Sequence, residues 1–284
     1  MSIWWAIMVA VGIINFLAAG YIVLKSRKWS ESEPESAKIF SLLRVCAMVF
    51  VTVAMYRSAF VSSYPDRMVW FNSILNSPFL IRCLATFAEL SAVTLSAAVL
   101  LKLNRQYDLG GGMKNKGAGR LFARAPYVSV ACIFTAQFFA FGGLITQYTW
   151  PFAVEEALWA LAFMCFVPLV ILGMRQIKAG RITQNNQKLF FRIMALWCVG
   201  YLAFQLLYAL PFMYFAEIAG DALKSIPPDA LRTAIFDYNE TRSFEAWGGI
   251  GFMIWHSAYF SLTAWIYLFG FMAARKDSGG KFLD

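Results

Sequence analysis

The chain has 284 residues, of which 60% are apolar and 14% charged, and its formal net charge is +9 at pH 7. An ordinary soluble domain has roughly half apolar and about a quarter charged residues, so this much apolar surface does not fit inside one soluble core. The composition excludes a secreted, cytosolic or disordered protein. It predicts an all-α polytopic integral membrane bundle, folded as a single domain over residues 1–284.

Seven stretches are long and apolar enough to cross a bilayer, which requires about 20 mostly apolar residues per helix. Charged, glycine-rich or proline-containing segments separate them, as is typical of helix ends. We therefore predict a bundle of seven transmembrane helices, at about residues 3–24, 38–60, 77–101, 124–147, 152–174, 188–212 and 249–273.

The stretch 213–248 has no clear apolar periodicity. Residues 212–215 could extend the sixth span, whereas Pro227 and Pro228 break any helix that precedes them. We predict a long outer loop here, with room for one interfacial helix. Asn239 begins a glycosylation sequon in this loop, which would be used only in a eukaryotic secretory pathway.

The distribution of lysine and arginine predicts the orientation of the chain. Most of the 25 basic residues follow the first, third, fifth and seventh spans, and basic residues are retained on the cytoplasmic side during insertion. The amino terminus is therefore expected outside and the carboxyl terminus in the cytoplasm, in a plasma or inner membrane. Anionic lipid headgroups are enough to explain the basic loops, so we expect no nucleic-acid partner.

An offset of 150 residues aligns part of the chain with itself. It places Lys25 on Arg175, Lys38 on Lys188, and Phe40 on residue 190, and it superposes the first two spans on the fifth and sixth. One interpretation is a parallel 3+1+3 repeat, a plan that occurs in transporters. The other is chance, because any two apolar helices joined by a basic loop would match about as well.

The sequence offers no metal or disulfide framework. All five cysteines fall inside predicted spans without CxxC spacing, and His256 is the single histidine. We therefore predict no metal site, and the sequence identifies no cofactor. The aromatic content of 17% suits a chromophore or lipid pocket, but it also suits an ordinary lipid-facing surface.

Glu89 is the clearest candidate for function, since an ionisable group in hydrocarbon costs about 2.5–3.5 kcal/mol on insertion scales. It lies near the middle of the third span, and Arg82 precedes it by about two helical turns. Both side chains therefore share a face, with Thr86 between them. The axial separation of about 10 Å predicts no direct ion pair, so we expect partners from other helices. Alternatively, both residues only fix helix packing, or Arg82 extends to the outer headgroups.

Glu155 and Glu156 follow a proline at the expected start of the fifth span. A carboxylate in the first turn of a helix is stabilised by the helix dipole, so capping is expected for one of them. Adjacent residues point about 100° apart, so at most one should face the bundle. Arg57 lies at the outer end of the second span, at the same level, and its positive charge could compensate the charge of such a carboxylate.

Further polar residues are predicted in the outer half of the bundle. They are Gln205 and Tyr208 on the sixth span, His256 on the seventh and Asn15 on the first. Because the inner half is almost purely apolar, the pattern predicts a polar vestibule that opens outward and is closed below, with Glu89 as its floor.

The favoured function is translocation of an ion or small polar solute, with protonation or cation occupancy of Glu89 coupled to opening. The alternatives are a receptor that binds an anionic ligand at Arg57 and Arg82, a lipid-modifying enzyme with Glu156 or Glu89 and His256 as acid and base, and a subunit of a larger membrane complex. The enzyme is less favoured because no nucleophile or metal cluster accompanies the acids, and no catalytic residue is assigned. Expected partners are the lipid bilayer, the transported species, and further copies of the chain or other complex subunits.

Overall fold

The structure, a computed structural model, describes residues 3–27, 36–63, 66–109 and 116–275. The described part is all-α apart from three two-residue strands. Its long helices are α1 (Ile3–Lys25), α3 (Ala37–Ala59), α4 (Pro78–Tyr107), α5 (Lys116–Thr146), α6 (Thr149–Lys178), α7 (Asn185–Phe204) with its π-helical continuation η3 (Gln205–Phe215), and α9 (Gly249–Ala273).

Six helical segments of the described chain are long and apolar enough to cross a membrane. They are α1, α3, α4, the part of α5 from Leu121, α6, and the segment Asn185–Leu223. The chain thus has the make-up of an integral membrane protein. The predicted span 249–273 coincides with α9, a helix of 25 residues. Helices α4, α5 and α6 extend several residues beyond the predicted spans, because they continue into polar ends.

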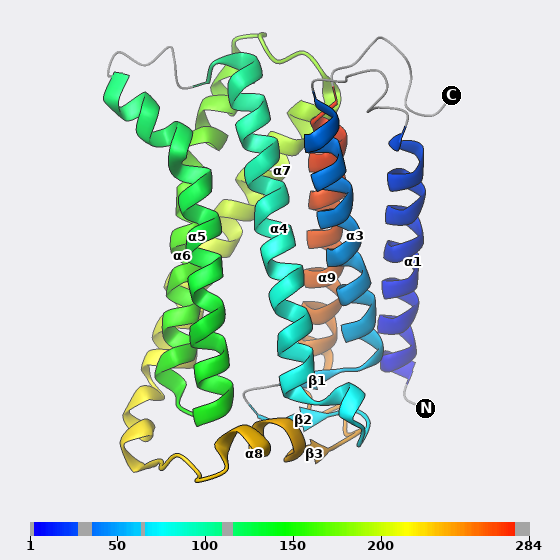
Figure 1. The fold of residues 1–284 in the computed structure, drawn as a ribbon, viewed down its shortest axis with the longest axis vertical. Helices are drawn as coiled ribbons and strands as arrows, with labels where there is room; N and C mark the ends of the chain where they lie inside the picture. Colours follow the sequence, from blue (N-terminus) through cyan, green and yellow to red (C-terminus); the bar gives the residue numbers. More distant parts are fainter. Residues whose placement is uncertain (1–2, 28–35, 64–65, 110–115, 276–284) are drawn as a thin grey trace.

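Helices that follow one another in the chain pack side by side from α1 through α7, and α9 contacts α1, α3, α4 and α7 (Figure 1). Large apolar side chains fill the space between them, with Phe40, Phe166, Phe190 and Phe271 almost fully buried. Helix α5 contains Pro126, which interrupts the backbone hydrogen-bond ladder, and one end of α5 leans away from the bundle.

Glycine is required where α6 and α7 approach closely. A Cβ added at Gly173 would come within 2.1 Å of the Phe191 ring. Since Phe191 is itself fully buried between these helices, any larger residue at 173 would force the two helices apart.

One end of the bundle carries a small folded cap. The strands β1 (Ser62–Ser63), β2 (Met68–Val69) and β3 (Asn239–Glu240) form a sheet in that order, antiparallel between β1 and β2 and parallel between β2 and β3. The short helices η2 (Ile74–Asn76), η4 (Ile218–Leu223) and α8 (Ala230–Phe236) belong to the same segments. The segment predicted as a loop with room for one interfacial helix therefore contains α8, η4 and a strand, and the sixth apolar helix extends into it.

An aromatic cluster lies under the sheet. Trp4 packs edge-on against Trp70 with ring centroids 4.8 Å apart, and Trp247 is 6.3 Å from Trp4. The cluster joins the first turn of α1 to the loop after α3 and to the segment before α9. The last turns of α1, α4 and α6 are basic, and they lie at the opposite end of the bundle. The predicted cytoplasmic terminus, beyond residue 275, lies outside the described residues.

Asp221 determines where α6 begins. Its carboxylate oxygens accept hydrogen bonds from the backbone N–H of Thr149 at 2.8 Å and of Trp150 at 2.9 Å. The prediction that Glu155 or Glu156 caps this helix is wrong, because α6 starts at Thr149 and has no acidic residue in its first turn. The sequence pattern was misleading because the proline at position 151 lies inside the first turn rather than before it.

Candidate functional site

Arg82 lies at the centre of a buried polar cluster between α4, α5 and α6. Its side chain is fully buried, and its Nη2 lies 3.0 Å from Oε2 of Glu89. Its Nη1 lies 3.1 Å from Oε1 of Glu155 and 3.3 Å from Oε1 of Glu89. Arg82 thus binds Glu89 with both terminal nitrogens, and it reaches Glu155 on a second helix. A guanidinium suits this geometry because its planar fork offers several fixed donors.

The prediction that Arg82 and Glu89 share one face of the helix is confirmed by these contacts, but the prediction that they are too far apart to pair is wrong. The axial rise measures the distance between the Cα atoms of the two residues. An arginine side chain is long enough to lie along the helix, and in hydrocarbon surroundings it extends toward the carboxylate rather than toward water.

Gln137 of α5 completes the cluster, although the sequence reasoning did not single it out. Its Oε1 accepts a hydrogen bond of 2.5 Å from Arg82 Nη2, and its Nε2 donates to Oε2 of Glu89 at 3.0 Å and to the carbonyl of Ile133 at 2.9 Å. The amide therefore connects acid and base through a third helix. A glutamine in the middle of the apolar span 124–147 was the signal that could have identified it.

Glu156 forms a neighbouring polar group with the end of α7. Its Oε2 accepts hydrogen bonds from Gln205 Nε2 and from the Tyr201 hydroxyl, which lies 3.4 Å away. Gln205 is 1% exposed and also donates to the Tyr201 oxygen at 2.6 Å. The prediction that only one of the paired glutamates faces the bundle is wrong, because Glu155 contacts Arg82 while Glu156 contacts α7 on the adjacent side.

Carboxyl groups outnumber guanidiniums in this region of the described chain. Glu89, Glu155 and Glu156 carry three carboxylates, whereas the two guanidiniums that interact with them are those of Arg82 and Arg57. Arg57 lies 5.0 Å from the centroid of the Phe260 ring and interacts electrostatically with Glu155. Because an unbalanced charge is costly away from water, the region favours the uptake of one positive charge.

The other predicted residues lie at varying distances from this cluster. The Thr86 hydroxyl donates a hydrogen bond of 3.1 Å to the backbone carbonyl of Arg82. The buried His256 packs against Phe260, with ring centroids 4.5 Å apart, and interacts electrostatically with Arg57. Tyr208 is 54% exposed on the surface of η3, away from the cluster.

Asn15 belongs to a separate polar group that joins α1 to α9. Its Nδ2 donates to the Ser261 hydroxyl at 2.9 Å, and its Oδ1 accepts from Trp265 Nε1 at 3.1 Å. The structure therefore brings together Arg82, Glu89 and Glu155, with Glu156, Gln205 and Arg57 beside them, and it leaves Asn15 and Tyr208 apart.

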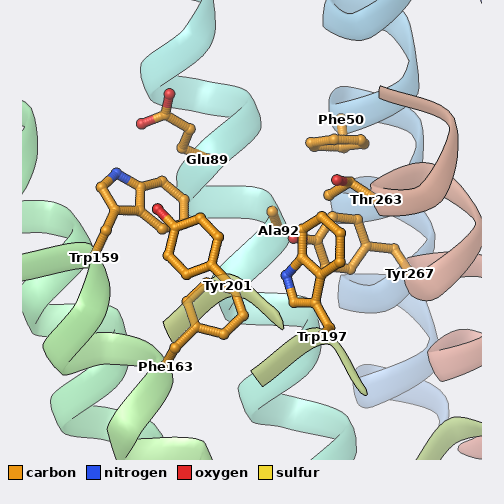
Figure 2. A pocket seen from close by; sticks show the side chains of 9 residues that line it. All are labelled: Phe50, Glu89, Ala92, Trp159, Phe163, Trp197, Tyr201, Thr263 and Tyr267. Atoms are coloured by element: carbon orange, nitrogen blue, oxygen red, sulfur yellow. The ribbon is translucent and has the colours of Figure 1, made fainter. Parts of the chain in front are cut away.

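An aromatic cage adjoins Glu89 (Figure 2). Rings from α3, α6, α7 and α9 surround a small cavity that has room for about one water molecule. Its walls are Phe50, Trp159, Phe163, Trp197, Tyr201 and Tyr267, with Glu89, Ala92 and Thr263 completing the lining. A second cavity of similar size shares Trp159, Phe163 and Tyr267 with the first and is also lined by Ser96 of α4.

The cluster is closed in this structure, in contrast to the predicted outward-opening vestibule. Arg82 has no exposed surface, and Glu89 and Glu155 are buried. A wide surface groove does exist at the capped end of the bundle, between Trp5, Phe71 and neighbouring residues, but none of the predicted pathway residues lines it.

A further buried polar contact lies at the inner ends of the helices, beyond the predicted spans. Gln187 of α7 is fully buried there, accepts a hydrogen bond of 2.5 Å from the Tyr107 hydroxyl, and donates to the carbonyl of Ala273 at 3.2 Å. These residues tie the ends of α4, α7 and α9 together. The sequence did not predict these contacts, because Tyr107 and Gln187 lie close to charged loop residues, as is typical of helix ends.

Comparison of the chain with protein-family models, with characterised protein sequences and with solved structures finds no match. In the described part of the chain, no three His, Cys, Asp or Glu side chains are grouped so that they could hold a metal ion. The carboxylates are instead separated by donors from Arg82, Gln137 and Gln205. The assignment of function therefore rests on the chemistry of this cluster alone.

Proposed function

We propose that the chain is a multi-pass membrane protein that translocates a small cation across a plasma or inner membrane. Its spans are α1, α3, α4, α5, α6, α7 with η3, and α9, seven in all. The capped end of the bundle faces outward and the basic end faces the cytoplasm. The basic last turns of α1, α4 and α6 support this orientation, since basic residues are retained inside.

The excess of carboxylates around Arg82 is the observation that carries the proposal. Two guanidiniums cannot neutralise Glu89, Glu155 and Glu156 when all three are ionised. Gln137, Gln205 and Tyr201 supply only neutral hydrogen bonds. A proton or a monovalent cation that binds there removes the net charge, and its release restores it. Such reversible charge uptake at mid-membrane is what a translocation site requires.

Binding at the cluster can alter the contacts between helices. When Glu89 is neutral, its attraction to Arg82 weakens, and the guanidinium is then held mainly by Glu155 of α6 and Gln137 of α5. The strength of the contacts between α4 and the α5–α6 hairpin therefore depends on whether Glu89 has bound a cation. A local change of charge at Glu89 can therefore change how these helices pack.

We place the outer gate at η3. This segment is π-helical over 11 residues and contains Pro211, and its first residue, Gln205, is hydrogen-bonded to Glu156. π-Helical turns are rare and occur frequently at functional sites. A shift of η3 would separate Gln205 from Glu156 and expose the carboxylates to the outer solution.

The parallel 3+1+3 repeat remains a hypothesis within this proposal. It would relate α1, α3 and α4 to α6, α7 and α9, with α5 as the connector. Contacts of α1 with α3 and of α6 with α7 agree with it, as do those of α3 with α4 and of α7 with α9. Sequential packing alone also produces these contacts. Association with further copies of the chain or with other membrane subunits belongs to the same proposal.

Flux measurements on Glu89→Gln test the proposed function. Purified protein is reconstituted into liposomes, and proton, sodium and potassium fluxes are followed under imposed gradients. The variant leaves two carboxylates for two guanidiniums, so it should fold without a buried excess charge. We expect the native protein to carry a flux that depends on pH, and Glu89→Gln to reduce it at least about tenfold, a change of about 1.4 kcal/mol in barrier.

Glu217→Gln is the matched control, because it makes the same chemical change at an exposed carboxylate outside the bundle. Its flux should equal that of the native protein. If the folded native protein carries none of the three ions, or if Glu89→Gln retains the native flux and pH dependence, the proposed function is wrong.

A further inference from the structure

The two small cavities beside Glu89 lie in series along α4. The first is lined by Glu89 and Ala92, and the second by Val93 and Ser96, about one helical turn further from the capped end. Trp159, Phe163 and Tyr267 line both cavities. Together they extend from the carboxylate cluster into the inner half of the bundle.

Thr263 gives the first cavity an unsatisfied polar group. Its side chain is 3% exposed, and its hydroxyl has no hydrogen-bond partner among the described residues. A buried hydroxyl without a partner is destabilising, and a water molecule in the cavity would supply the missing hydrogen bond. Glu89 and Tyr201 line the same cavity, so a water there has further polar residues beside it.

The cavities are poorly suited to a metal ion. Each has room for about one water molecule, and aromatic rings form most of the walls. A metal cation that enters such a space must give up its hydration shell, and it needs a ring of oxygen ligands in exchange. A proton needs only a chain of hydrogen-bonding groups.

We infer that the transported cation is the proton, and that it passes from Glu89 toward the cytoplasm through two internal waters, one at Thr263 and one at Ser96. This inference rests on the proposed function and assigns its cargo. The proton leaves the Glu89 carboxyl group for the first water, which releases one of its own protons to the second. The second water releases a proton toward the cytoplasmic water, so both waters are regenerated. Glu89 is left as a carboxylate and takes up the next proton from the outer side.

Thr263→Val and Ser96→Val test the two water positions in the liposome assay. The first variant keeps the shape of the side chain and removes its hydroxyl, and the second fills the space of one water with a methyl group. We expect each to reduce proton flux at least about tenfold. Thr263→Ser keeps the hydroxyl and should retain most of the flux, which separates a water-binding role from a packing role.

Thr135→Val is the matched control, because it makes the same change on an exposed face of α5. Thermal unfolding of each variant in detergent verifies that it is folded. A folded Thr263→Val with native proton flux overturns the water path, while the proposed function stands. A native protein that carries sodium or potassium but not protons overturns the assignment of cargo. A folded native protein without any flux overturns both proposals.

Discussion

The polar groups around Asn15 and around Arg82 both join helices inside this bundle, and they differ in charge balance. The group around Asn15 is neutral, and both ends of its amide are satisfied by Ser261 and Trp265 of α9. The group around Arg82 is charged, and three carboxylates share its vicinity with two guanidiniums. Both were candidates from the sequence, yet their geometries support different roles.

The two groups therefore differ in role: the Asn15 group serves helix packing, and the Arg82 group can bind a cation. A neutral and satisfied amide holds α1 against α9 and has nothing to gain from a further ion. The cluster at Arg82 spans three helices and gains stability when it takes up positive charge. Variants in the two groups should therefore differ both in the stability they lose and in whether they alter flux.

The largest loss of stability is expected for Arg82→Met. Removing the guanidinium leaves Glu89 and Glu155 buried without their main partner, and breaking a buried ion pair from one side costs about 3–5 kcal/mol. Unfolding in detergent, by heat or by titration with a denaturing detergent, measures the change. Arg232→Met, at an exposed arginine of α8 that is 3.8 Å from Asp229, should be near native. Equal stabilities of the two variants would contradict the central position of Arg82.

Gln137→Leu should cost less, about 1–3 kcal/mol, because the ion pair remains and only the bridging amide is lost. Arg82 Nη2 and Glu89 Oε2 each lose one hydrogen bond at a buried position, while the bond between them remains. The same unfolding assay measures this loss, and the double variant Gln137→Leu with Glu89→Gln should show less than the sum of the two single effects. Additive losses would mean that Gln137 and Glu89 act independently.

Much of the fold follows from the sequence because hydrocarbon imposes strong rules on composition. Apolar runs of sufficient length can only be helices there, so the positions of α1, α3 and α9 agree with the prediction within a few residues. The cap could not be foreseen. Its strands are two residues long, and β3 pairs with β2 from a distant part of the chain, which no local pattern encodes.

The candidate site was predictable in its members but not in its connections. A charge inside an apolar run identifies Arg82 and Glu89, because it is rare and costly. The direction in which the Arg82 side chain extends, and the rotation of α6 about its axis that turns Glu155 toward it, depend on three-dimensional packing. Gln137 and Asp221 were missed for a related reason, since a single polar residue shows its role only through a partner on another helix.

Asp221→Ala tests the charged group indirectly, because Asp221 fixes the start of the helix that carries Glu155 and Glu156. Loss of the cap should cost about 1–2 kcal/mol, near the upper end of values for helix capping residues. Glu217→Ala, which removes an exposed acid from the same segment, should be nearly neutral. If the two variants unfold alike, the hydrogen bonds from Thr149 and Trp150 contribute little to stability.

Asn15→Leu should have the smallest effect. Interhelical hydrogen bonds in membrane proteins contribute about 0.6 kcal/mol each on average, so the loss of two gives about 1 kcal/mol, and the added apolar contacts of leucine offset part of it. Flux should equal that of the native protein, because the amide is hydrogen-bonded on both sides and lies apart from the carboxylates. A large loss of flux in this variant would mean that the α1–α9 contact belongs to the transport pathway, and the distinction between the packing group and the charged group would then fail.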